Sequence, residues 1–357
     1  MLGPFSFVRN QARSPGYALP VGKVGARTAA RVGALVVLLV GSPAFGALPE
    51  VRAGHVAPEG SPWDLAVRMV VDHLAPRVAP RRVKLFGGAV LGDEEAHLEK
   101  CRNGQLQICG ISDFASAKVV PELGVFALPF LFRDDQEIEY AIDRLLLERL
   151  GPAFRRAGLH LLVLAGVGWL DIATRRPVRG GDLTGVRMRV PGNPVHSRLA
   201  QVLGARPVSA SMQEVDTLLQ AGLVDGLFHT QVFLFGSGWS KNLRHILEAR
   251  LAFSCAMVVF NQAFWESLPE SVRKDLTEHG KEVARATWRE YRTVVPRVRR
   301  ELIASGLTIT GPSPEVQRQL EDKLGRAQMM TLIGPAASRL ATEVEHLLEA
   351  RRPAPRP

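Results

Sequence analysis

Beyond residue 50 the chain alternates between strand-like and helix-like segments, separated by short connections rich in glycine and proline. Ser61 followed by Pro62 is a typical helix start, with serine as the N-cap and proline at the first helical position. The apolar segment 83–86 stops at Gly87 and Gly88, as a strand does before a turn. Strands that alternate with helices are typical of α/β units. The sequence therefore predicts an α/β fold with mainly parallel sheets.

The same alternation continues to the C-terminal region. Besides the helix that starts at Pro62, we predict helices over residues 93–102, 134–150, 193–204, 211–222, 269–305 and 314–350. We predict strands over residues 83–86, 106–111, 159–165, 185–190, 223–226 and 251–260. The last two helical segments are long, and the proline-rich segment 349–357 is predicted to be a disordered tail.

Composition narrows the class of protein further. The chain has 357 residues, of which 46% are hydrophobic and 22% are charged. That is enough apolar material for real cores, and it excludes a disordered chain and a small disulfide-stapled domain. The formal net charge is +10, but residues 1–47 contribute five basic residues and no acidic ones. The rest is only modestly basic, so we expect no nucleic-acid partner.

The N-terminal region has the pattern of an export signal. Arg27 and Arg31 precede the apolar run 32–40, and small residues and a proline follow at 41–47. This order is typical of a secretory signal peptide, and the apolar run is short for a membrane span of roughly 20 residues. We predict that residues 1–47 are a signal peptide and that the protein is periplasmic. An uncleaved N-terminal anchor is the alternative.

The three cysteines are Cys101, Cys109 and Cys255, and an odd number cannot form a complete set of disulfides. Cys101 and Cys109 could pair. The alternative is that all three are free, with Cys109 and Cys255 acting as small apolar residues inside strands.

Six segments, in order and at matching spacing, resemble the extracytoplasmic solute-binding subunits of TRAP transporters, the DctP family. The segments are 55–63, 86–94, 123–133, 182–191, 203–207 and 214–226. The resemblance covers about residues 52 to 300. It implies a two-lobed periplasmic-binding-protein-like fold with a central cleft, hinge segments and long C-terminal helices. The lobes implied are 48–168 with 256–294, and 169–255 with 295–348.

The resemblance also implies a function. Such a protein captures a small organic acid, usually a carboxylate, between its lobes and delivers it to the membrane permease subunits of the transporter. Closure would follow from population shift, because a ligand that contacts both lobes favours the closed form. We expect a monomer without a cofactor. An exported sensor of the same fold without a permease is the alternative, and a periplasmic enzyme is a further one.

Arg189 stands where the family's ligand-binding arginine stands. Its guanidinium presents a planar fork of donors that matches the two oxygens of a carboxylate. Two alternatives stay open. Arg189 could pair with a structural acid such as Asp182 or Glu214, and Arg187 lies on the same face of the predicted strand and could take the role instead.

The sequence departs from the family pattern at two places. His229 replaces a ligand-binding asparagine after the Asp–Gly pair and follows the aromatic Phe228, and Trp169 stands near the place of a second arginine. These changes predict a larger or less acidic ligand, because aromatic faces cover apolar or ring-bearing groups. Trp239 resembles a tryptophan found in part of the family. For both tryptophans, packing in the core or between the lobes is the alternative, and for His229 it is a structural hydrogen bond.

Four further residues complete the predicted ligand contacts. Glu59 lies in the loop after the first strand, Ser112 and Asp113 follow the strand that ends at Ile111, and Gln213 precedes a predicted helix. Ligands in α/β folds bind near the carboxyl ends of strands. Asp113 would repel an anion, so it would accept a hydrogen bond from a hydroxyl or amine. We find no convincing catalytic or zinc-ligand pattern, and we predict that the protein is not an enzyme and has no metal.

Overall fold

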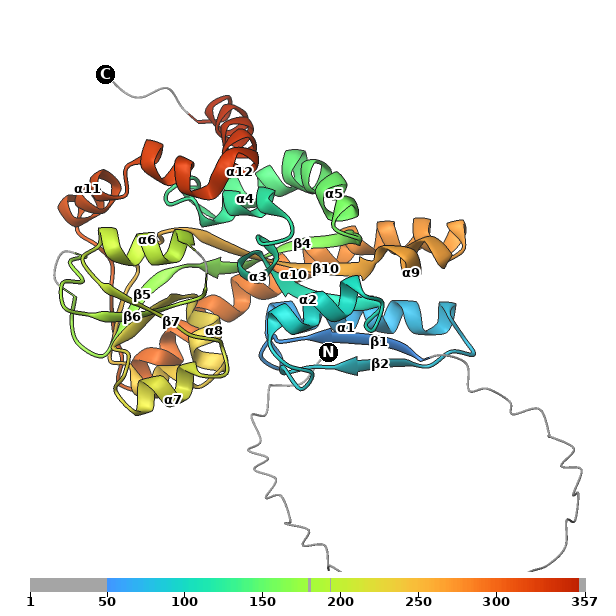
Figure 1. Cartoon of the computed structure of the whole chain (residues 1–357), viewed down its shortest axis with the longest axis horizontal. Coiled ribbons are helices and arrows are strands. Elements are labelled where there is room, and N and C mark those ends of the chain that lie inside the picture. Colours follow the sequence, from blue (N-terminus) through green and yellow to red (C-terminus); the bar gives the residue numbers. More distant parts are fainter. Residues whose placement is uncertain (1–49, 179–180, 193, 353–357) are drawn as a thin grey trace, which may run out of the picture. The chain divides into compact units, whose positions relative to one another are not determined.

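The structure is a computed structural model that describes residues 50–178, 181–192 and 194–352. The predicted signal peptide, residues 1–47, lies outside the described residues, as does most of the predicted tail. Residues 50–352 form an α/β fold whose strands make two sheets, with β1 and β2 at one end and β6 and β7 at the other (Figure 1). The predicted fold class is confirmed.

The first sheet has five strands in the order β2-β1-β3-β10-β4. β1 is parallel to β2 and β3, whereas β10 is antiparallel to β3 and β4. The strands are β1 (Val51–His55), β2 (Val83–Phe86), β3 (Ile108–Ser112), β4 (Leu159–Trp169) and β10 (Phe253–Asn261).

The second sheet has six strands in the order β11-β9-β5-β8-β6-β7. β6 is parallel to β7 and β8, β11 is parallel to β9, and β5 is antiparallel to β8 and β9. The strands are β5 (Asp171–Thr174), β6 (Arg187–Val190), β7 (Arg206–Ser209), β8 (Gly226–His229), β9 (His245–Leu247) and β11 (Thr308–Thr310).

The chain crosses between the sheets at two adjacent places. β4 continues into β5 through Leu170, and the chain returns from β9 to β10 through Leu251 and Ala252. The two crossings are hydrogen-bonded to each other: the Leu170 N–H donates to the Ala252 carbonyl (2.8 Å), and the Leu251 N–H donates to the Leu170 carbonyl (2.9 Å). These crossings bring β5 and β10 into their sheets antiparallel, so the sheets are mixed and less parallel than predicted.

The helices connect these strands and cover them. The α-helices are α1 (Pro62–Leu74), α2 (Glu94–Arg102), α3 (Asp113–Ser116), α4 (Asp135–Ala141), α5 (Leu147–Arg156), α6 (Pro194–Val202), α7 (Val215–Gln220), α8 (Gln231–Gly236), α9 (Gln262–Ser267), α10 (Glu270–Ala304), α11 (Pro314–Lys323) and α12 (Arg326–Glu349). Shorter helical segments are η1 (Ala75–Arg77), η2 (Pro121–Ala127), η3 (Ile142–Leu146) and η4 (Trp239–Asn242). None of the helices in this described part combines the length and apolar content needed to cross a membrane.

Helix starts agree well with the sequence. The Ser61 hydroxyl accepts the Asp64 N–H (3.2 Å) at the start of α1, and the Asp93 carboxylate accepts the Ala96 N–H (2.8 Å) at the start of α2. Caps of this kind satisfy backbone donors that no helical carbonyl can reach.

Other boundaries differ from the prediction. The strand predicted at 223–226 is β8 at Gly226–His229, because Gly222 to Asp225 form the turn before it. The helix predicted from 211 begins only at Val215, since Ser211 hydrogen-bonds the Glu214 carboxylate instead of capping a helix. The final helical stretch is divided into α11 and α12 around Gly325, with a further kink at Gly334, where φ is 81°.

The C-terminal segment packs differently from the predicted lobe division. Residues 295–348 were assigned to the second lobe, but the apolar face of α12 shares a core with η2, β4 and β10 on the side of the first sheet. The predicted tail also begins in ordered structure, because Arg352 pairs with Glu137 at 2.6 Å. An apolar helical face is stabilised by packing against other apolar surface, and here that surface comes mainly from η2, within the core that also contains β4 and β10.

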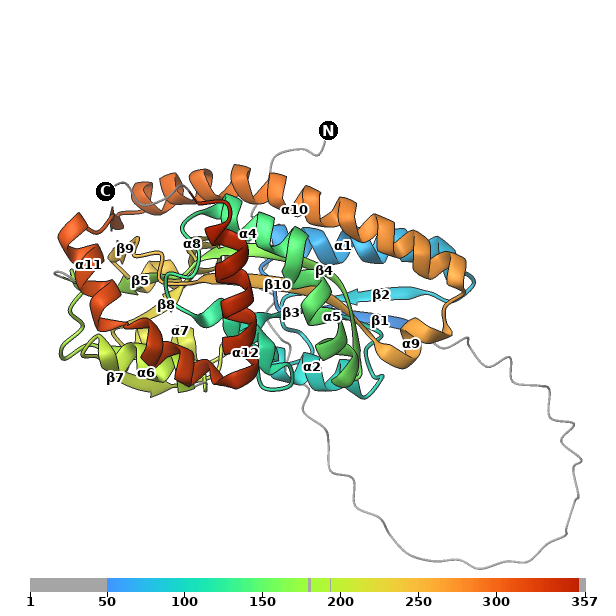
Figure 2. The same cartoon turned by 90° about the horizontal axis from the view of Figure 1, so that it is seen from above.

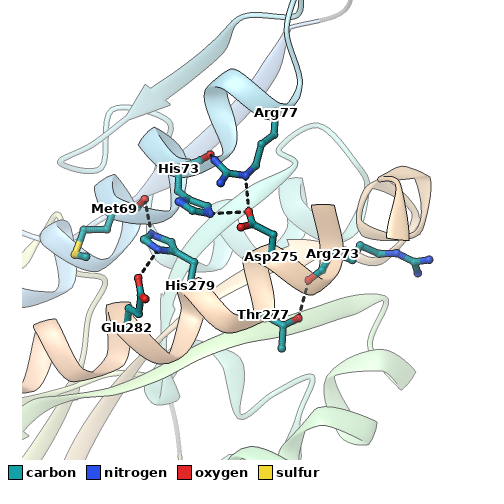
Figure 3. A network of polar contacts seen from close by, with 8 residues as sticks. All are labelled: Met69, His73, Arg77, Arg273, Asp275, Thr277, His279 and Glu282. Atoms are coloured by element: carbon teal, nitrogen blue, oxygen red, sulfur yellow. Dashed lines mark hydrogen bonds and ion pairs between the residues drawn. The ribbon is translucent and has the colours of Figure 1, made fainter. Parts of the chain in front are cut away.

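The 35-residue helix α10 packs against α1, β4 and α8 and so contacts elements of both sheets' surroundings (Figure 2). Its polar contact with α1 is shown in Figure 3. His73 on α1 contacts Asp275 on α10 (2.7 Å), and Arg77 pairs with the same carboxylate. The His73 and His279 rings stack with centroids 3.7 Å apart. These contacts hold α1 against α10.

The three cysteines are free and buried, so Cys101 and Cys109 do not form a disulfide. Cys109 and Cys255 lie in β3 and β10, as predicted. Burial raises the pKa of both thiols.

Candidate functional site

A cavity of about 390 Å³ is lined by residues from the surroundings of both sheets. On the side of the first sheet its wall comes from α1, α2, the end of β3, α3, β4 and β10. On the side of the second sheet the wall comes from β6, the segments after β6 and β7, α6, β8 and α8. The lining residues are Trp63, Asp93, Glu94, Glu95, Ser112, Phe114, Ala115, Lys118, Val167, Arg189, Pro191, Gly192, His196, Ser209, Ala210, Ser211, Met212, Glu214, Phe228, His229, Phe233 and Ser254.

Arg189 lies near the carboxyl end of β6, a central strand of the second sheet, and only 5% of it is exposed. Its Nε and Nη2 donate to the Ala210 carbonyl at 3.0 and 2.7 Å. Burial lowers the pKa of Arg189 to about 10, opposed by the nearby Glu214 charge. Within the described residues Arg189 forms no ion pair. The guanidinium is therefore a buried cation in the cavity wall whose charge no carboxylate of the described residues balances at contact distance.

The alternatives weighed for this arginine now have definite geometry. Arg187 binds Asp225 through two hydrogen bonds, Nε to Oδ2 at 2.8 Å and Nη2 to Oδ1 at 2.7 Å, and it is not among the lining residues. Glu214 accepts the Ser211 N–H and hydroxyl, and Asp182 accepts the Thr184 N–H and hydroxyl. Glu214 and Asp182 thus each accept hydrogen bonds from a neighbouring residue, and Arg187 is paired with Asp225.

Two histidines lie beside Arg189. Burial, together with the positive charge of Arg189, lowers the pKa of His196 and of His229 to about 3, so both rings are neutral near pH 7. The Thr230 N–H donates to His229 Nδ1 (2.9 Å), which places the ring proton on Nε2. His229 is therefore a neutral hydrogen-bond donor. Phe233 stacks on its ring with centroids 4.4 Å apart.

The opposite wall carries a buried carboxyl group. Glu94, the first residue of α2, is 6% exposed and accepts the backbone N–H of Ser112. Burial, with smaller contributions from the neighbouring Asp93 and Glu95 charges, raises the pKa of Glu94 to about 7, opposed by the hydrogen bonds from Ser112. Glu95 is exposed and pairs with Lys118 on the segment after α3 (2.6 Å).

One buried donor on this wall, Trp63 Nε1, has no hydrogen-bond partner among the described residues. Trp63 lies over Gly110 of β3, where an added Cβ would come within 2.9 Å of Nε1. Glycine at this position thus makes room for the indole. A buried donor without a partner is costly, so a ligand or water that accepts a hydrogen bond from Trp63 Nε1 would remove that cost.

A second cavity of about 250 Å³ shares Phe114, Lys118, Gly192 and His196 with the first. Asp113, predicted as a ligand contact, lines this second cavity. Its Oδ1 accepts the Ser254 hydroxyl (2.8 Å) and the Cys255 N–H (2.9 Å), and burial raises its pKa to about 7. Asp113 therefore joins α3 to β10.

Of the predicted ligand contacts, four line the main cavity: Arg189, Phe228, His229 and Ser112. Trp169 does not, because its Nε1 donates to Asp135 (2.7 Å) and its ring packs edge-on against Phe253 next to the crossing segments. Trp239 is buried behind His229, with ring centroids 5.7 Å apart.

Glu59 and Gln213 are exposed and are not among the lining residues. Glu59 lies in the turn before α1, and Gln213 lies two residues before α7.

Several lining residues were not predicted as contacts, notably Trp63, Glu94, Phe114, His196 and Phe233. Trp63 and Glu94 end two of the family-like segments, so their sequence positions contained a signal that went unused. His196 and Phe233 lie on helices that look like ordinary core helices in sequence. Within the described ranges no three His, Cys, Asp or Glu side chains gather as a metal site.

Two α/β sheets joined by paired crossings, with a polar cavity lined from both, are the architecture of a two-lobed solute-binding protein. A sequence model of the DctP family, described as "Bacterial extracellular solute-binding protein, family 7", matches residues 53–328. The chain therefore belongs to this family.

Relatives and solved structures agree. The chain is 25% identical over 241 residues to the 2,3-diketo-L-gulonate-binding periplasmic protein YiaO of Escherichia coli, covering 66% of this chain and 73% of that protein. It is 25% identical over 243 residues to the C4-dicarboxylate-binding periplasmic protein DctP of Vibrio cholerae, covering 68% and 73%. A TRAP periplasmic solute-binding protein from Ralstonia eutropha with bound (S)-2-acetolactate superimposes with a TM-score of 0.78 at 21% identity, covering 85% of this chain and 99% of that one.

Proposed function

We propose that this protein captures a small carboxylate outside the cytoplasm, holds the carboxylate group on Arg189, and delivers the ligand to a TRAP-type membrane permease. It binds its ligand without chemical turnover. Residues 1–47 act as the export signal in this proposal, and the two sheets with their helices act as lobes that close on the ligand.

The buried charge of Arg189 is the observation that carries this proposal. A buried cation without an ionic partner is costly, and an anion that enters the cavity removes that cost. The Ala210 carbonyl accepts hydrogen bonds from Nε and Nη2, and these bonds hold the guanidinium plane in place. A carboxylate bound to the remaining donors forms charge-assisted hydrogen bonds that are stronger than neutral ones.

The neutral donors beside Arg189 support the same assignment. His229 presents Nε2–H as a donor. Neither His229 nor His196 carries a positive charge near pH 7, so this wall carries one positive charge, that of Arg189, rather than three. One charge is appropriate for one carboxylate.

The named relatives point to the same chemistry. YiaO is named for 2,3-diketo-L-gulonate, DctP of Vibrio cholerae for C4-dicarboxylates, and the Ralstonia eutropha protein holds (S)-2-acetolactate. All three ligands carry a carboxylate. Ligand contacts to both walls would shift the population toward a closed form, and a micromolar ligand supplies about 8 kcal/mol for this.

A thermal-shift screen of organic acids, followed by calorimetric titration, tests the proposal. Ligand that binds only the folded state raises Tm. We expect at least one mono- or dicarboxylate to raise Tm of the wild-type protein, Arg189→Met to abolish that shift, and Arg187→Met to retain it. The proposal fails if no carboxylate in the screen shifts Tm, or if Arg189→Met binds as the wild type does.

A further inference from the structure

We propose that Glu94 selects the far end of the ligand, so that the cavity takes a hydroxylated monocarboxylate and rejects the matching dicarboxylate. This inference rests on the proposed function, because it assumes that Arg189 holds the first carboxylate. It adds the chemical class of the ligand and a specificity-determining residue on the opposite wall.

The charges that line the cavity leave room for one anionic group. Among the described lining residues the cationic side chains are Arg189 and Lys118, and Lys118 is already paired with Glu95 at 2.6 Å. The acidic side chains are Asp93, Glu94, Glu95 and Glu214. A second carboxylate on the ligand would therefore meet an acidic wall with no available cation.

Glu94 differs from its two acidic neighbours on α2. Asp93 caps the helix by accepting the Ala96 N–H, and Glu95 is exposed and bound to Lys118. Glu94 is buried, and among the described residues its hydrogen bonds come from Ser112, through the backbone N–H and the side-chain hydroxyl. A carboxylate has sites for about four hydrogen bonds, so Glu94 can accept more from a ligand.

The hydrogen-bonding character of Trp63 and Glu94, on the same wall, decides which ligand group fits between them and Arg189. Trp63 Nε1–H can only donate, and the Glu94 carboxylate can only accept. A hydroxyl group accepts from Trp63 and donates to Glu94 at the same time. A carboxylate accepts only and is repelled by Glu94, and an ammonium donates only and leaves Trp63 Nε1 without a partner. A hydroxyl group therefore suits both Trp63 and Glu94, which neither a carboxylate nor an ammonium does.

Two matched pairs of probes test the inference: D-gluconate against D-glucarate, and D-erythronate against meso-tartrate. Within each pair the molecules differ only at the last carbon, which is a hydroxymethyl group or a carboxylate. Calorimetric titration at pH 8 would give the affinity ratio, monocarboxylate over dicarboxylate, for the wild type, Glu94→Gln and the control Glu95→Gln. The control removes the same charge one residue away, where the side chain is exposed.

We expect the wild-type protein to prefer the monocarboxylate by at least about tenfold in one pair or both. Glu94→Gln should reduce that ratio about tenfold by strengthening the dicarboxylate, and Glu95→Gln should leave it within about twofold. Gln keeps an oxygen for the Ser112 N–H, and Glu94→Asp is a second variant if Glu94→Gln does not fold.

The inference is overturned if the wild type binds the two members equally in both pairs, if it binds other carboxylates but neither pair, or if Glu94→Gln leaves the ratio unchanged. Each of these results leaves the proposed function standing. The proposed function itself fails only if no carboxylate binds or if binding is independent of Arg189.

Discussion

The two walls of the cavity present buried groups of opposite charge. On the β6 wall Arg189 is 5% exposed, and on the α2 wall Glu94 is 6% exposed. Burial shifts both groups toward their neutral forms: it lowers the pKa of Arg189 to about 10 and raises the pKa of Glu94 to about 7. At neutral pH the arginine stays fully charged and the glutamate is only partly ionised. The two walls of the cavity therefore differ in charge. This difference orients a ligand that has a carboxylate at one end and a different group at the other.

The two groups are held in the same way. Arg189 donates to the backbone carbonyl of Ala210, and Glu94 accepts the backbone N–H of Ser112. A main-chain group fixes the geometry of a charged side chain without cancelling its charge. Arg187, two residues earlier on β6, differs because Asp225 balances its charge. Two arginines on one strand thus have different roles because only one has an acidic partner.

The largest expected effect is on the β6 wall. Arg189→Lys should weaken carboxylate binding about 100-fold, because an ammonium cannot reproduce the planar fork that binds two carboxylate oxygens. Arg187→Lys is the matched control and should change affinity less than about twofold, since its side chain is 41% exposed and lies outside the lining. Titration of the best ligand from the screen measures both. Equal losses for the two variants would remove the distinction between these arginines.

The next effect concerns pH and the α2 wall. Glu94, whose pKa is raised to about 7, is mostly ionised at pH 8 and mostly protonated at pH 6. A dicarboxylate that binds only when Glu94 is protonated should therefore bind up to about tenfold more tightly at pH 6 than at pH 8. The ionisable groups around Glu94 are Asp93, Glu95, Cys109, Asp113 and Lys118.

Of these, Asp113 also has a pKa raised to about 7, so Asp113→Asn is the necessary comparison. Titration of D-glucarate at both pH values should show the dependence in the wild type and in Asp113→Asn, and its loss in Glu94→Gln. A pH dependence that survives in Glu94→Gln would assign the effect to another group.

Trp63→Phe should have a smaller effect. It keeps an aromatic ring but removes the Nε1–H donor, which has no partner within the part of the chain that the structure describes. One neutral hydrogen bond is worth about 1 kcal/mol, so D-gluconate should bind about fivefold more weakly. An acid of similar length without hydroxyl groups, such as hexanoate, should lose nothing. Calorimetric titration of both ligands separates a lost hydrogen bond from lost packing, which would weaken both.

The smallest effect separates His229, which lies beside Arg189, from Trp239 behind it. His229→Phe should weaken carboxylate binding about threefold, because it removes the Nε2–H donor. Trp239→Phe should leave affinity unchanged, since Trp239 lies behind His229 and is not a lining residue. If Trp239→Phe weakens binding more than His229→Phe, the geometry of this wall is different from that described.

Local sequence signals predicted much of the fold. Ser61–Pro62 and Asp93 mark helix starts because capping is a local interaction. The glycine pair at 87–88 follows the end of β2, and a turn is also a local feature of the sequence. The position of β8 was three residues out, because strand length depends on pairing with β5 and β6, which a single segment does not reveal. The placement of α12 with the first sheet likewise depends on long-range packing.

The site was partly predictable. The resemblance indicated Arg189 and His229, and strand-end position indicated Ser112. Trp169 was misplaced because an indole at the end of a strand can face the cavity or the core, and the partner that holds it, Asp135, is distant in sequence. Glu94 was not predicted as a contact, because three consecutive acids at a helix start look alike until burial distinguishes them.

A crystal structure of the protein with the acid that gives the largest thermal shift tests the central claim most directly. The account predicts a carboxylate within hydrogen-bond distance, about 2.7–3.2 Å, of the Arg189 guanidinium, and a ligand hydroxyl at a similar distance from Glu94. A ligand bound with its carboxylate on any other group, or outside the cavity between the β6 and α2 walls, would contradict it.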